Sequence, residues 1–80
     1  YMKEIIKAEP LENYELLLTF EDGEKKVKDM KPYLEKGVFK KLQNIEVFKN
    51  VKIKYGTVCW DEDIDICADS LYETSKKLKN

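Results

Sequence analysis

The sequence contains no histidine and no arginine. Histidine is the side chain that most often moves protons near neutral pH and binds transition metals, so its absence excludes Ser-His and Cys-His nucleophile schemes and histidine-based zinc sites. Arginine supplies the bidentate grip on phosphate and guanine, and that grip is missing as well. Several common kinds of catalytic and nucleic-acid-binding site are therefore excluded.

Length and cysteine content are also low. The chain has 80 residues, which predicts one domain spanning residues 1–80 that buries about 60 to 65% of its unfolded surface. So small a core leaves little chain for a deep catalytic cleft. Cys59 and Cys67 are too few for a disulfide framework, and we expect two reduced thiols. Tyr1 precedes Met2, the natural initiator, and is interpreted as the remnant of an expression tag.

Charged residues make up 39% of the chain but cancel to a net charge of -1, so no overall electrostatic footprint for nucleic acid is present. The 42% hydrophobic and 11% aromatic content is typical of a folding chain. No segment approaches the roughly 20 apolar residues that span a bilayer, and no signal-peptide pattern opens the sequence. We expect a cytoplasmic protein with no membrane association.

The first half of the chain predicts an antiparallel meander. Residues 3–9 are expected to form a strand that Pro10 ends. Residues 14–20 alternate apolar and polar side chains, with Tyr14, Leu16, Leu18 and Phe20 on the buried face. Asp22-Gly23 is a strong hairpin signal, and residues 25–29 should return as a strand with Val27 inward and Lys26 and Lys28 outward.

The second half predicts short helices and a second hairpin. Helical turns are expected over residues 31–37 and 39–49, the latter with Asn44 as a helix cap. Residues 51–60 alternate around a turn at Gly56, residues 64–66 can add a strand, and Asp69 or Ser70 can cap a terminal helix that uses Leu71, Tyr72 and Leu78. The predicted fold is α+β: a small two-layer domain with an antiparallel N-terminal meander plus a second hairpin, covered by short helices.

Three segments together resemble one family. Residues 16–24 carry a TF-x-DG-x hairpin, residues 37–42 read G-V-F-x-x-L, and residues 58–72 fit V-x-W followed by D-I-x-x-D-x-L-Y. In order and spacing they resemble the small bacterial domain of unknown function 2442 family over roughly residues 3–72. Members usually carry Pro-Asn-Gly after the tryptophan, where this chain has Asp61-Glu62-Asp63. The resemblance implies an α+β fold, no established activity, and a protein partner encoded nearby.

An acidic segment near the C-terminus is a candidate cation site. Its carboxylates are Asp61, Glu62, Asp63, Asp65 and Asp69. Of these, Asp61, Asp63 and Asp65 match ligand positions 1, 3 and 5 of an EF-hand loop. However, Ile66 occupies the position that requires glycine, and Tyr72 the position of the bidentate glutamate. A solvated loop followed by a helix cap at Asp69 accounts for the same residues, so no metal or other cofactor is predicted. The pair Asp65 and Asp69 leaves open an acid-base enzyme.

A basic run, Lys25, Lys26 and Lys28, leaves open a nucleic-acid-associated regulator. Acidic residues flank the run and no aromatic stacking platform lies beside it, so lysines that protect a sheet edge are the favoured interpretation. Nucleic acid is therefore not the expected partner.

Aromatic and aliphatic side chains are numerous for so small a domain, and a two-layer fold leaves one sheet face open to water or to a partner. Leu17, Trp60 and Tyr72 are the candidates for this exposure. Apolar faces of this kind favour self-association, most often as a two-fold dimer. The function that the sequence favours is a noncatalytic interaction module that acts through protein contacts as a homodimer.

Overall fold

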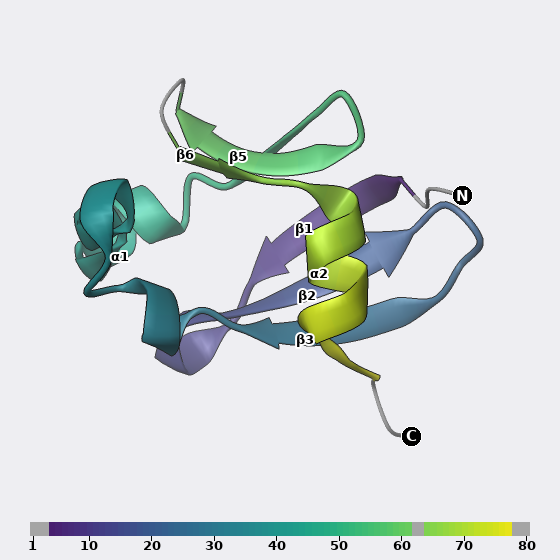
Figure 1. The fold of residues 1–80 in the computed structure, drawn as a ribbon, viewed down its shortest axis with the longest axis horizontal. Coiled ribbons are helices and arrows are strands. Elements are labelled where there is room, and N and C mark those ends of the chain that lie inside the picture. The colour runs from purple at the N-terminus through teal and green to yellow at the C-terminus, as the bar shows by residue number, and fades with distance from the viewer. Residues whose placement is uncertain (1–3, 62–63, 78–80) are drawn as a thin grey trace.

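A computed structural model describes residues 4–61 and 64–77, and it has the predicted α+β architecture (Figure 1). The larger sheet has four strands in the order β1-β2-β3-β7: β1 (Ile5–Pro10), β2 (Glu15–Phe20), β3 (Lys25–Asp29) and β7 (Lys76–Lys77). The antiparallel meander β1-β2-β3 confirms the prediction. The short fourth strand, β7, was expected to be the end of a helix and instead pairs with β3.

The smaller sheet consists of β4 (Lys52–Lys54), β5 (Thr57–Asp61) and β6 (Ile64–Ile66), joined antiparallel in that order. These strands confirm the predicted second hairpin and its return strand. Figure 1 shows this sheet lying across from the larger one, with α2 (Ala68–Thr74) bridging them at one end and α1 (Ile45–Phe48) at the other. No helix among the described residues is long and apolar enough to cross a membrane.

The remaining helical segments are short 3-10 turns: η1 (Glu12–Tyr14), η2 (Lys31–Tyr33) and η3 (Gly37–Gln43). Asn44 caps α1 as predicted, because its Oδ1 accepts a hydrogen bond from the Glu46 amide at 3.0 Å. The predicted cap of α2 is wrong. This helix begins at Ala68 with Cys67 at its N-cap, and Asp69 lies in its first turn, where a carboxylate still interacts favourably with the helix dipole.

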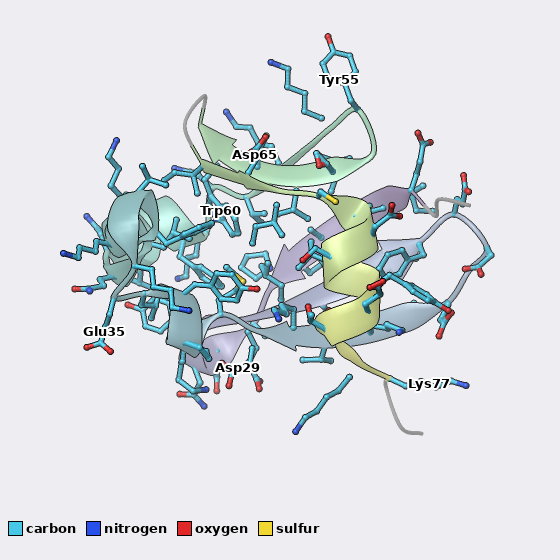
Figure 2. The ribbon with its side chains drawn as sticks, in the orientation of Figure 1. Asp29, Glu35, Tyr55, Trp60, Asp65 and Lys77 are labelled. Atoms are coloured by element: carbon cyan, nitrogen blue, oxygen red, sulfur yellow. The ribbon has the colours of Figure 1, made fainter. Side chains whose placement is uncertain are left out.

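The core lies between the two sheets. Leu16, Leu18 and Phe20 alternate along β2 and are fully buried, as the period of the strand requires. Trp60 is also part of this core. It is only 5% exposed, its Nε1 donates to the Phe48 carbonyl at 2.8 Å, and Figure 2 shows its side chain lying between the two sheets. The expectation that Trp60 is exposed is therefore wrong, because a nearby carbonyl satisfies its one polar atom and allows complete burial.

The hairpin between β2 and β3 determines which side chains of β3 face the core. Gly23 donates to the Phe20 carbonyl and Phe20 to the Glu24 carbonyl, so residues 21–23 form a three-residue loop that ends in the left-handed Gly23, at φ 89°. In this register Leu18 pairs with Lys26 and Leu17 with Val27. The predicted orientation of β3 is wrong: Lys26 and Lys28 share the face of the core, and Val27 lies on the opposite face.

The turn between β4 and β5 carries a conformational cost. Tyr55 and Gly56 have positive φ values of 54° and 74°, which a two-residue type I′ hairpin requires at both central positions. Tyr55 is 91% exposed and points away from the body of the protein (Figure 2). Gly56 is required sterically as well, because a Cβ there would lie 2.8 Å from the Glu4 side chain.

Replacing Tyr55 by asparagine is expected to stabilise the fold. The left-handed conformation costs an ordinary L-residue about 1–2 kcal/mol, and asparagine tolerates it. We expect Tyr55→Asn to raise the free energy of unfolding by about 0.5–1 kcal/mol in urea denaturation. The matched control, Lys54→Asn, introduces the same residue one position earlier, within β4, and should bring no gain. Equal effects of the two substitutions would contradict this account of the turn.

Candidate interaction surface

Polar side chains of β3 hold α2 against the core face of the larger sheet. Lys26 Nζ donates to the Tyr72 carbonyl at 2.6 Å and lies 3.7 Å from the centroid of the Tyr72 ring. Lys28 is only 8% exposed, and its Nζ donates to Thr74 Oγ1 at 2.8 Å. The Tyr72 hydroxyl in turn donates to Glu24 Oε1 at 2.9 Å. Two ammonium groups thus lie near the C-terminal end of a helix, where cations are favoured.

These contacts separate the basic run into two environments. Lys26 and Lys28 are bound to α2 within the protein, whereas Lys25 is exposed on the opposite face of β3. The three lysines therefore do not form one continuous basic surface.

Tyr72 is half-buried, and its ring also packs edge-on against Phe20 at 5.2 Å between centroids. Of the three predicted exposed residues, only Leu17 lies on an open sheet face.

The outer face of the larger sheet carries an apolar pair at its centre. Leu17 of β2 and Val27 of β3 are directly opposite each other, so their side chains contact on the same face. Both are half-buried. In Figure 1, α1, α2 and the second sheet lie on the other side of these strands, whereas Pro32 of η2 lines a hollow beside Val27. The sequence pattern identified Leu17 but missed Val27, because Val27 was assigned to the core.

Charged side chains of opposite sign occupy the two ends of this face. At one end, Lys7 and Lys25 flank Thr19 on the neighbouring strands. At the other end, Glu15 lies directly opposite Asp29, and like charges in this position repel. We call the surface made by Leu17, Val27 and these two charged ends the open face.

Asp29 is partly compensated within the chain. Its Oδ1 accepts a hydrogen bond from the Lys31 amide at 2.9 Å and lies 3.3 Å from Lys31 Nζ. The Lys31 amide is the main cause that lowers the pKa of the Asp29 carboxyl below its usual value, and the Lys31 and Lys28 charges contribute in the same direction. Asp29 is therefore ionised throughout the neutral range, and the acidic end of the open face remains acidic.

Two of the candidate cation ligands, Asp65 and Asp69, lie on different elements of the described part of the chain. Asp65 is exposed (Figure 2) and alternates with the buried Ile64 and Ile66, so its side chain points away from the core. Asp69 lies in the first turn of α2. Among residues 4–61 and 64–77, no group of three carboxylate or thiol side chains is arranged to hold a metal ion. Asp63 and the side chain of Asp61 lie outside the described part.

Two shallow hollows lie on the surface formed by the described residues. One, of about 170 Å³, lies between the β4–β5 turn and the start of α2 and includes Tyr55, Cys67 and Asp69. The other, of about 280 Å³, borders the open face and is lined in part by Glu15, Val27 and Asp29. Both cysteines are free thiols, as expected. Cys59 lies on β5 of the smaller sheet, so it is not part of the open face. The second hollow extends the apolar centre of the open face towards β7.

Comparison with known proteins identifies a family and no activity. The model of the family described as "Protein of unknown function (DUF2442)" matches residues 5–77 of the chain. No curated protein and no solved structure matches it.

The contacts of Lys26 predict a stability difference between adjacent lysines. Lys26→Gln removes a charge-assisted hydrogen bond and a cation–π contact, and we expect it to lower the free energy of unfolding by about 1–2 kcal/mol. Lys25→Gln makes the same chemical change at an exposed site and should shift it by less than about 0.5 kcal/mol. Chemical denaturation measures both. Equal losses would show that Lys26 is not bound to α2 in solution.

Asp29 predicts a pH-dependent term in stability. Because its folded-state pKa is lowered, its ionised form stabilises the fold above the unfolded pKa of about 3.9, and this contribution is lost as pH falls through the folded value. Asp29→Asn keeps the oxygen that accepts from Lys31 but removes the charge. We expect a deficit of about 0.5 kcal/mol or less near pH 6, because solvent screens this exposed group, and no deficit near pH 2. A deficit that is constant with pH would contradict the assignment.

Proposed function

We propose that this chain, which belongs to the DUF2442 family of proteins of unknown function, is a noncatalytic protein-interaction module of the cytoplasm. The open face is its contact surface. The observation that carries this proposal is the cross-strand pair of Leu17 and Val27 at the centre of the sheet face that points away from α1, α2 and the second sheet.

The open face resembles a protein contact surface in composition. Its centre is aliphatic and its two ends are charged, which corresponds to the apolar core and polar rim of an interface. Removing apolar surface from water contributes about 25 cal/mol per Å², so covering Leu17 and Val27 favours association. Charged groups around them keep the free protein soluble and give the contact its orientation.

The two other functions weighed from the sequence have less support in the described residues. Catalysis by Asp65 and Asp69 requires both carboxylates at one site, and Asp65 is on the exposed side of β6 whereas Asp69 is on α2 beside the smaller hollow. Nucleic-acid binding by the basic run requires accessible lysines, and two of the three donate to α2. A protein contact at the open face needs neither set of residues.

Purification at native expression levels tests the proposal. We expect the wild-type protein, isolated from the cells that naturally produce it, to elute in an assembly heavier than one chain when measured by size exclusion with light scattering. The double variant Leu17→Thr/Val27→Thr should lose this assembly, because it makes the centre of the open face polar while threonine, which is β-branched, still suits a strand at both positions.

Val38→Thr is the matched control, because Val38 is an exposed valine on η3, away from the open face. It should retain the assembly. Circular dichroism checks that each variant is folded. A wild-type protein that elutes as a single chain, or a folded double variant that keeps the full assembly, would exclude the open face as the contact surface.

A further inference from the structure

We propose that a second copy of this chain docks at the tip of the β4–β5 hairpin, where the Tyr55 ring of each copy enters the hollow beside the hairpin tip of the other. This is the hollow that Tyr55 borders together with Glu4, Cys67 and Asp69, and we call it the tip hollow. None of these residues belongs to the open face. The inference therefore adds a second contact surface to the proposed function and does not depend on it.

The projecting part of this contact is the Tyr55 side chain. It is the most exposed large apolar side chain in the described part of the chain, at 91%, and it points away from the body of the protein (Figure 2). Its left-handed backbone, at φ 54°, suits glycine or asparagine better, so the turn itself does not require an aromatic ring here. Tyrosine is among the residues that contribute most at protein contacts.

The tip hollow has the size and the lining to accept a phenol ring. Its volume is about 170 Å³, and an enclosed cavity of about 150 Å³ accommodates benzene. Its wall is mostly apolar, and the carboxylates of Glu4 and Asp69 lie on its border. A tyrosine that enters it places an apolar ring on apolar atoms and brings its hydroxyl near oxygens that accept a hydrogen bond strongly.

Backbone contacts hold the wall of the tip hollow in place before a second copy binds. The Ile5 amide donates to the Gly56 carbonyl at 3.0 Å, and the Glu21 amide donates to the Glu4 carbonyl at 2.8 Å. The Glu4 side chain packs directly over Gly56, where a Cβ would lie 2.8 Å from it. Because the wall is already formed, docking costs little ordering of the chain.

Lys54 lies beside the Tyr55 ring and makes the contact complementary in charge. Its Nζ is 5.8 Å from the ring centroid, so a ring in the tip hollow of a second copy brings this ammonium group towards Glu4 and Asp69 there. Within residues 4–61 and 64–77, Lys54, Glu4 and Asp69 form no ion pair. The contact thus offers these charges partners of opposite sign.

Ring and hollow belong to one continuous patch, because Tyr55 itself borders the tip hollow. A two-fold dimer requires such a patch, since both copies use the same surface. Each tyrosine buries at most about 150–250 Å², so the contact is smaller than the roughly 1,200–2,000 Å² of a standard interface. We therefore expect a weak dimer, with a dissociation constant on the order of 100 µM.

Sedimentation equilibrium of the pure protein, extended to millimolar concentration, tests the ring. We expect the wild type to dimerise and Tyr55→Asn to weaken the dimer at least about tenfold. Tyr55→Asn is also expected to stabilise the fold, so unfolding cannot explain this loss, and urea denaturation of the same sample checks it. Tyr55→Phe keeps the ring without its hydroxyl and should weaken the dimer less, by about three- to tenfold.

A pair of charge variants tests the complementarity. At low salt, Lys54→Glu is expected to weaken the dimer about tenfold, because it places like charges together twice per dimer. Lys52→Glu is the matched control: it makes the same change of net charge on the same strand, two residues further from the tip, and should weaken the dimer less than about twofold. The difference should shrink in about 0.5 M salt, since exposed charges are then screened.

Alkylation of Cys67 reports where the second copy docks. This thiol is exposed and borders the tip hollow, so a docked ring shields it. At a protein concentration ten times the dissociation constant, about four fifths of the chains are dimeric by mass action, and the reaction with iodoacetamide should slow about fivefold relative to dilute protein. Cys59, on β5 and outside the lining of the hollow, is the internal reference and should change little.

The remaining outcomes overturn the inference. A pure protein that stays monomeric at millimolar concentration excludes the second copy as the occupant, and a native assembly that Tyr55→Asn abolishes would then assign the tip hollow to a different protein. An unchanged dimer in Tyr55→Asn, or alkylation of Cys67 that does not slow, excludes the hairpin tip. Leu17→Thr/Val27→Thr should dimerise as the wild type does. If only that double variant loses the dimer, the second copy occupies the open face, so this inference fails while the proposed function stands.

Discussion

The length of the loop between β2 and β3 determines which side chains of β3 face the solvent and which face the core. A loop of Asp22 and Gly23 alone would pair Leu18 with Val27 and turn Lys26 and Lys28 outward. The observed loop includes Glu21, pairs Leu18 with Lys26, and so exchanges the two faces of β3. The face on which each side chain of β3 lies follows from that difference of one residue, because side chains on a strand alternate with a period of two.

Two lysines on the core face require acceptors, and α2 provides them. An unpartnered ammonium group beside a hydrophobic core would be strongly unfavourable. The carbonyl of Tyr72 and the hydroxyl of Thr74 accept from Lys26 and Lys28, while the aliphatic parts of both lysines cover apolar surface. The register of the hairpin and the position of the C-terminal helix are therefore mutually dependent. The same register leaves Val27 beside Leu17 on the outer face.

Of the three residues predicted to be exposed, only Leu17 lies on the open face. Leu17 was identified because it faces away from the buried residues of β2. Trp60 was not recognisable as a core residue, since its burial depends on the Phe48 carbonyl, twelve residues away. Tyr72 contacts Phe20, Glu24 and Lys26, which are remote in sequence. Val27 was missed because the rule that Asp-Gly marks a hairpin does not specify how many residues the loop contains.

Local patterns in the sequence determined the elements themselves: the alternation along β2, the turn glycines at positions 23 and 56, the asparagine cap of α1 and the resemblance that the family match over residues 5–77 confirms. These depend on neighbouring residues, whose spacing is visible in the chain. Tertiary structure decided which face of β3 is buried, where the lysines find acceptors and which apolar pair remains outside. Those outcomes depend on pairing between strands and on contacts between distant segments, and no local pattern fixes a register that shifts with a single loop residue.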